Sequence, residues 1–426
     1  MHALLRSSHT LAALLAPVFA AVLASGLALG ARTPEEERHD RIVLASGKEV
    51  HCRVLHEGPD TLVYDDGKRH EVKRADVREV HSVERSLREF LTKLDATSKS
   101  DAQALAALAR WCEEEALLGE ATATWIRVVA ADPENEEAWT KLGAVKSKKG
   151  WRVRQRSRLV TVEEYRKGLA DWKNAFELRT AHYLLRTDIP PRNAVDLAIA
   201  IERVHQAYYD MLAPVVPLYV FEEVPEIHIH VNPTHMPKPP SPGEKAWFEV
   251  LSNRLTVDAD QEGWELEAVR RMADLLTYNS FRRTTGKQGE MPAWLQEGLG
   301  QSFVGAARRG DEGLRFEFGV PLRALFATHA KDTKPVHLQT LLGSGFAAFR
   351  AGSDAERLVA QAYTLLQFLV HGNDGAHRAA LATYLQSAFH GQGALVHLEK
   401  ALGWKEAQID ASWKSYVELV HNDRSK

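Results

Sequence analysis

Four charged residues have the spacing of a metal-binding helix pair, but their types differ from those that bind metal. In an H-E-x-x-H helix, two histidines lie one turn apart on one face, and the glutamate beside the first acts as a general base. A glutamate on a later helix can supply the third ligand. Here Arg270, Arg271 and Asp274 occupy the three motif positions, and Glu297 follows in the segment WLQEGL. The spacing for metal-dependent hydrolysis is kept, while both histidines and the base are replaced.

The residue types at these positions argue against a zinc centre. An arginine guanidinium does not deprotonate in proteins, so Arg270 offers no lone pair to a metal and Arg271 cannot act as a base. Asp274 and Glu297 beside two fixed cations do not make the three good donors and the open position that catalytic zinc takes. We therefore expect no catalytic residue, no metal ligand and no zinc cofactor at these four positions.

Without a dication, a buried Glu297 carboxylate would be costly unless another cation paired with it. We hypothesise that Arg270 occupies the volume of the metal and bridges Glu297 and Asp274 through a bidentate fork. An internal ion pair would then link the two helices in place of the metal. The alternative is that Arg270 and Arg271 both face solvent and that the spacing is a coincidence.

Three histidines form a second candidate for metal binding. His228 and His230 share one face of a predicted strand, because side chains alternate along a strand, and His235 follows soon after. No carboxylate or cysteine spacing supports them as ligands. We interpret them as part of an exposed strand face.

Composition limits the classes to which the chain can belong. At 426 residues it exceeds what one hydrophobic core usually serves, so two or three domains are expected. A hydrophobic fraction of 45% argues against wholesale disorder, and a net charge of −3 favours no particular charged partner. Cys52 and Cys112 fall in different predicted modules, so we expect no disulfide framework.

The N-terminus has the pattern of an export signal. Residues 1–31 contain Arg6, an uncharged apolar run over residues 11–30, and small residues before Ala31 that a signal peptidase accepts. We predict export to the periplasm or cell envelope. The alternative is that residues 11–30 stay as a membrane anchor, which would be the protein's contact with the membrane.

Three modules are predicted before the main domain. Residues 41–83 alternate as five short strands separated by turn signals, which favours a small SH3-like barrel. Residues 84–150 have helical periodicity and contain one tetratricopeptide-like helix pair around Asp132-Pro133, which we interpret as a helical spacer. Residues 151–170 are predicted as a basic linker. The basic stretch lacks the stacking aromatics of a nucleic-acid site, so no nucleic-acid partner is expected.

Residues 171–422 are predicted as one α+β domain with a helical C-terminal half. A long amphipathic helix is expected from about residue 188 to residue 212. Strands are expected at residues 176–186, 218–221, 226–231 and 248–257, with a short strand pair near residues 314–318.

Residues 176–420 resemble the peptidase MA-like domains of the gluzincin superclass, to which thermolysin belongs. The resemblance rests on a strand-rich first half, the helix around residue 270, the block WLQEG at residues 294–298 and a helical tail. It implies a gluzincin-like domain with a degenerate H-E-x-x-H motif. It also makes Trp294 and Tyr363 candidates for residues that line a cleft, although helix packing is the other interpretation of Tyr363.

We therefore predict an exported, catalytically inactive peptidase-like protein that binds a peptide or a protein of the cell envelope. One alternative is an active zinc metallopeptidase with a displaced or atypical metal site. Another is an envelope scaffold that binds its partners through the N-terminal barrel and the helical spacer.

Overall fold

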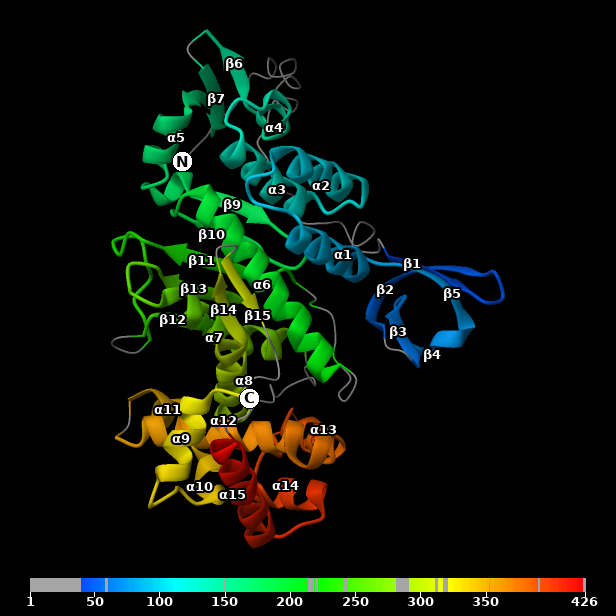
Figure 1. The fold of residues 1–426 in the computed structure, drawn as a ribbon, viewed down its shortest axis with the longest axis vertical. Coiled ribbons are helices and arrows are strands. Elements are labelled where there is room, and N and C mark those ends of the chain that lie inside the picture. The colour runs from blue at the N-terminus through cyan, green and yellow to red at the C-terminus, as the bar shows by residue number, and fades with distance from the viewer. Residues whose placement is uncertain are drawn as a thin grey trace, which may run out of the picture.

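A computed structural model describes residues 40–423 except 58–59, 149, 214–217, 219–220, 222, 241–243, 281–290, 311–312, 317–320, 352 and 390. The described chain is mixed α+β, with sheets in its N-terminal part and a helical C-terminal half (Figure 1). The predicted export signal, residues 1–31, lies outside the described residues.

The five predicted N-terminal strands are all present and form one curved antiparallel sheet. Their order is β4-β3-β2-β1-β5, and Ile42, Cys52 and Leu62 are fully buried on the inner face. In the described residues β4 and β5 do not pair, so no closed barrel is found, and the SH3-like identity of this module stays a prediction. The chain passes between them through a 3-10 turn, η1 (Arg74–Asp76), and each remains an edge. The strands are β1 (Asp40–Leu44), β2 (Glu49–Glu57), β3 (Thr61–Asp65), β4 (Arg69–Lys73) and β5 (Val77–His81).

The predicted helical spacer consists of four helices. Ser82, Asp101 and Asn135 cap three of them by accepting backbone N–H groups of the first turn. The Asp132-Pro133 pair separates the third and fourth helices, as the sequence predicts. Cys112 is a free, buried thiol, as is Cys52 in the sheet. The helices are α1 (Val83–Ala96), α2 (Ala102–Glu114), α3 (Leu118–Ala131) and α4 (Glu136–Lys141).

The segment predicted as a basic linker, residues 151–170, is ordered instead. It contributes to a three-stranded antiparallel meander and a short helix, α5 (Val162–Gly168), which begins with a capping box between Thr161 and Glu164. Alternating basic side chains suit a meander that is exposed on one face, so charge density alone did not reveal it. The strands are β6 (Val145–Ser147), β7 (Gly150–Gln155) and β8 (Arg158–Thr161).

A five-stranded mixed sheet follows, with the order β12-β13-β11-β10-β9. Two segments that the sequence suggested as single strands, residues 176–186 and 248–257, are each split by a turn into two antiparallel strands. Of the predicted strand at residues 218–221, residues 219 and 220 lie outside the described residues, and Leu218 and Phe221 are not in a strand. The strands are β9 (Phe176–Arg179), β10 (Leu184–Thr187), β11 (Glu226–His230), β12 (Ala246–Glu249) and β13 (Arg254–Asp258).

Two long helices, α6 (Pro191–Leu212) and α7 (Trp264–Ser280), contact this sheet and each other. Ile227 and Ile229 of β11 belong to the main core, together with Leu255 and Val257 of β13. Pro190 and Pro191 begin α6, because proline at the first helical position has no amide hydrogen to leave unpaired. No helix of the described residues is long and apolar enough to span a membrane.

The C-terminal half is helical (Figure 1). α8 (Ala293–Ala306) packs against α7 on one side and against α12 (Ala355–His371) on another. A short hairpin of β14 (Ala307–Gly310) and β15 (Gly313–Phe316) follows α8 and contacts α6. The other helices are α9 (Arg323–Lys331), α10 (Leu338–Gly343), α11 (Phe346–Ala351), α13 (Arg378–Phe389), α14 (Leu395–Leu402) and α15 (Glu406–Asn422), with the short turn η3 (Gly372–Gly375) after α12.

Candidate functional site

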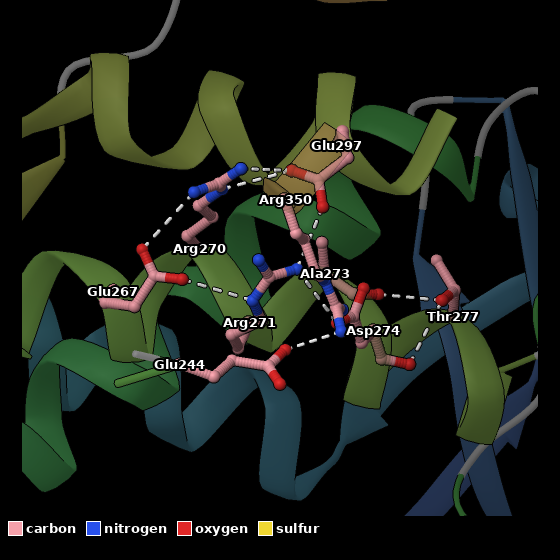
Figure 2. A network of polar contacts seen from close by, with 9 residues as sticks. All are labelled: Glu244, Glu267, Arg270, Arg271, Ala273, Asp274, Thr277, Glu297 and Arg350. Carbon is pink, nitrogen blue, oxygen red and sulfur yellow. Dashed lines mark hydrogen bonds and ion pairs between the residues drawn. The ribbon is translucent and has the colours of Figure 1, made fainter. Parts of the chain in front are cut away.

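The four residues that the sequence analysis compared with a metal motif meet at the contact between α7 and α8 (Figure 2). Arg270, Arg271 and Asp274 come from α7, and Glu297 comes from the first turns of α8. Glu267 lies one turn before the two arginines on the same helix, where i,i+3 and i,i+4 side chains are neighbours. The predicted juxtaposition of the two helices is therefore present.

Two glycines of α8 allow the close packing that brings these side chains together. A Cβ on Gly300 would lie 2.8 Å from the backbone oxygen of Arg270 on α7. A Cβ on Gly298 would lie 2.9 Å from the backbone oxygen of Ala362 on α12. Real Cβ atoms do not approach that closely, so α8 can lie between its two neighbours only because these positions have no side chain.

The Glu297 carboxylate is fully buried and is shared by two guanidinium groups. Arg270 Nε donates to Glu297 Oε2 over 3.1 Å, and Arg270 Nη2 also contacts that oxygen. Arg271 Nη1 donates to the other oxygen, Glu297 Oε1, over 3.0 Å. The Glu297 side chain is 0% exposed, and that of Arg271 is 4% exposed. The predicted link between Arg270 and Glu297 is confirmed.

The other half of the hypothesis is wrong, because Asp274 is paired with Arg271 rather than with Arg270. Arg271 Nη1 lies 3.4 Å from Asp274 Oδ2, whereas Arg270 Nη1 lies 3.4 Å from Glu267 Oε2. Arg270 is engaged instead by Glu267 of its own helix and by Glu297 of α8. The alternative in which both arginines face solvent is also wrong.

The network extends to a third helix through Arg350 of α11. Its Nη2 lies 3.8 Å from Asp274 Oδ2, and its Nη1 lies 2.5 Å from Glu244 Oε1 in the loop before β12. The Glu244 side chain is only 6% exposed. The ionic contacts therefore join α7, α8, α11 and one end of the sheet (Figure 2).

The electrostatic balance differs between the two carboxylates of the motif. Burial raises the pKa of Asp274 to about 6, since Arg271 and Arg350 compensate only in part and Glu297 adds repulsion. Burial also acts against the charge of Glu297, but Arg271 and Arg270 outweigh it and lower the pKa of Glu297 below its usual range. Burial disfavours the charge of Arg271, yet Asp274, Glu297 and Glu267 raise its pKa further above its usual range.

These contacts do not fit a zinc ion. Both oxygens of Glu297 already accept hydrogen bonds from arginines, and the two guanidinium groups offer no lone pair. Within the described residues, the group of His, Cys, Asp and Glu side chains compact enough to hold an ion is Glu84, His182 and His205, and it includes neither Asp274 nor Glu297.

The two cleft candidates are both core residues. Trp294 is 0% exposed, and its indole N–H donates to the hydroxyl of Tyr384 over 3.3 Å. Tyr363 is 1% exposed, and its hydroxyl accepts the backbone N–H of Leu322 over 2.8 Å. Neither ring has a surface on which a ligand could lie, so helix packing is the role that the structure gives to Tyr363 and Trp294.

The predicted exposed face of β11 is buried. His228 and His230 are 9% and 1% exposed, because Trp172 of the 3-10 turn η2 (Trp172–Asn174) covers them. The ring of His230 stacks on Trp172 with 3.9 Å between centroids, and His228 Nε2 lies 2.9 Å from Glu226 Oε2. Burial lowers the pKa of both imidazoles, to about 3 for His228 and about 4 for His230.

The sequence-based prediction missed Glu267, Arg350 and Glu244. Glu267 could have been found, because a glutamate three and four residues before two arginines is a known helical ion-pair pattern. Arg350 and Glu244 lie far from the motif in sequence, and no local spacing connects them to it. Searches for similarity to protein-family models and to curated proteins found no match to this chain.

Proposed function

We propose that this chain is an exported, peptidase-like protein without metallopeptidase activity, which binds a peptide or a protein of the cell envelope. The observation that carries the proposal is the burial of Glu297 between Arg270 and Arg271. The position at which a gluzincin would hold its third zinc ligand is neutralised by fixed positive charge. The two guanidinium groups beside it offer no lone pair to a metal and cannot act as a general base.

The binding part of the proposal draws support from the sheet next to the network. β12 is the end strand of the sheet order, and it contacts α7. An end strand can accept an extended peptide as an additional strand, through backbone hydrogen bonds that do not depend on a metal. A protein that has lost hydrolysis can retain this mode of recognition.

The experiment that tests the peptidase frame is reconstitution of its ligands. The triple variant Arg270→His, Arg271→Glu, Asp274→His would restore H-E-x-x-H on α7 opposite Glu297. We expect it to bind one equivalent of zinc more than the unmodified chain, measured by metal analysis after dialysis. The matched control adds Glu297→Gln to the triple variant and should lose that additional equivalent, because zinc needs three good donors.

Two results would overturn the proposal. A folded triple variant that gains no zinc would show that the spacing is not a metal frame. Hydrolysis of a peptide library by the unmodified chain, lost in Glu297→Gln, would show that the protein is an active peptidase. Mass spectrometry of the incubated library reads out the second result directly.

A further inference from the structure

A second cluster of ionisable side chains lies where the N-terminal helices meet the central sheet. Glu84 is in the first turn of α1, His182 lies in the turn between β9 and β10, and His205 is on α6. One donor atom from each lies within 4.8 Å of the other two. The two helices are also joined by an ion pair between Arg203 and Asp95, with Arg203 Nη2 2.7 Å from Asp95 Oδ1.

Outer contacts orient the two imidazoles. His182 Nδ1 lies 2.7 Å from Glu202 Oε2, and the backbone N–H of His182 donates to Glu202 Oε1 over 3.0 Å. His205 Nδ1 lies 2.8 Å from the hydroxyl of Tyr183. Glu202 and Tyr183 thus hold the two Nδ1 atoms, and the two Nε2 atoms face Glu84. Metal-binding histidines are typically held in this way, by a carboxylate or another polar partner on the other ring nitrogen.

We propose that Glu84, His182 and His205 form a structural site for one divalent transition-metal ion, with zinc as the first candidate. Two imidazoles and a carboxylate suit zinc in residue type, whereas the arginine-rich network on α7 and α8 does not. The ion would fasten α1 to α6 and to the β9–β10 turn. This site is separate from the one on which the proposed function depends.

The distances are close to those that an ion needs. With zinc–ligand distances of about 2.0–2.2 Å, neighbouring donors of a tetrahedral site lie about 3.3–3.6 Å apart. His182 Nε2 lies 2.7 Å from Glu84 Oε1, and His205 Nε2 lies 3.9 Å from the same oxygen. The two rings stack with 3.7 Å between centroids and 12° between planes. One ring must therefore tilt toward the other when an ion binds.

Burial and charge favour a structural role over a catalytic one. His182 is 8% exposed and His205 is 2% exposed, so a substrate cannot reach an ion held between them. Glu84 and Glu202 carry the two negative charges that would balance a dication. Histidine binds a metal through an unprotonated ring nitrogen, so metal binding is expected to become weaker at acid pH.

The test uses the full chain, stripped with a chelator and titrated with cobalt(II) while its visible absorption is recorded, followed by competition with zinc. We expect one equivalent of tightly bound ion and an upward shift of the thermal midpoint with zinc. His182→Ala and Glu84→Gln should each lower the affinity at least 100-fold. Glu202→Gln should lower it about 10- to 100-fold, because it removes an outer contact of His182. Circular dichroism confirms that each variant is folded.

The matched control is His70→Ala, which removes a histidine whose Nε2 lies 2.9 Å from Asp66 Oδ1 at a partly exposed position. It should keep the full affinity. Failure of the folded, unmodified chain to bind one equivalent would overturn the proposal, as would binding that survives both His182→Ala and His205→Ala. An equivalent that is lost in Glu297→Gln and kept in His182→Ala would place the ion on α7 and α8 instead.

Discussion

The two buried polar clusters of this protein hold their carboxylates with different cations. At the α7–α8 contact, two guanidinium groups surround Glu297, and their charge does not depend on pH in the physiological range. At the α1–α6 contact, an imidazole lies between Glu84 and Glu202. Imidazoles can lose a proton and offer a lone pair. The first cluster therefore has side chains that do not suit a metal ion, while the second has the imidazoles and carboxylate on which the proposed metal site rests.

The largest expected effect breaks the first cluster. Glu297→Gln leaves Arg270 and Arg271 without their shared carboxylate in a buried position, and we expect a loss of about 3–5 kcal/mol in the free energy of unfolding. Chemical denaturation measures it. The control is Glu89→Gln, which removes a half-exposed partner of Lys93 and should cost less than about 1 kcal/mol. Equal losses in the two variants would contradict the structural role of Glu297.

A pH-dependent effect tests the charge balance of the same cluster. The pKa of Asp274 is raised from 3.8 to about 6, so ionisation of Asp274 destabilises the folded state. This penalty is absent below the unfolded pKa of 3.8 and complete above about 6. As the pH rises through that window, the free energy of unfolding of the unmodified chain should therefore fall by about 2–3 kcal/mol relative to that of Asp274→Asn.

Urea denaturation of both proteins across the window provides the measurement for Asp274. The informative quantity is how the difference between the two free energies of unfolding changes with pH, because the effect of the asparagine amide itself is the same at every pH. A difference that stays constant with pH would indicate that Arg271 and Arg350 fully compensate the burial of Asp274.

A smaller effect tests the approach of the helices. Gly300→Ala would place a Cβ 2.8 Å from the backbone oxygen of Arg270, which forces α8 away from α7 and costs about 1–3 kcal/mol. Gly343→Ala is the matched control, since nothing lies within 4 Å of a Cβ there. Thermal unfolding of both variants provides the measurement. If Gly300→Ala leaves the stability unchanged, the helices can separate without cost.

The smallest effect concerns an exposed pair with the same chemistry as the first cluster. Arg110 Nε lies 2.7 Å from Glu137 Oε1, and the two side chains are 49% and 38% exposed. Water screens this pair, so Arg110→Ala should change the free energy of unfolding by less than about 1 kcal/mol. A loss close to that of Glu297→Gln would mean that burial does not distinguish the two guanidinium–carboxylate contacts.

Local patterns predicted the N-terminal strands well, because each is short, alternates in polarity and ends at a turn residue. The same patterns failed for residues 176–186 and 248–257, where a tight turn interrupts a mostly apolar segment. Asn253 turns the chain with a φ of 47°. Asparagine tolerates this left-handed conformation, but an asparagine in the sequence does not by itself predict it. The sequence also could not predict whether the first sheet closes, because closure depends on pairing between β4 and β5, which are separated by η1.

The candidate site was predictable only in part, for a related reason. Helical spacing placed Arg270 and Asp274 one turn apart, and Glu297 had to be paired if it was buried. Both Arg270 and Arg271 are within helical reach of Asp274, and the packed structure, in which Glu297 of α8 engages Arg270, decided between them. Arg350 and Glu244 reach the network from distant segments, so only the packed structure could reveal them.

By itself, the sequence determined the five N-terminal strands, the main helices and the residue types on α7 and α8 that make poor zinc ligands, because these follow from local periodicity and from the chemistry of single side chains. Tertiary structure decided which charges are buried together. It united Glu84, His182 and His205, which no local spacing relates, since contacts between distant segments arise only when helices and sheets pack.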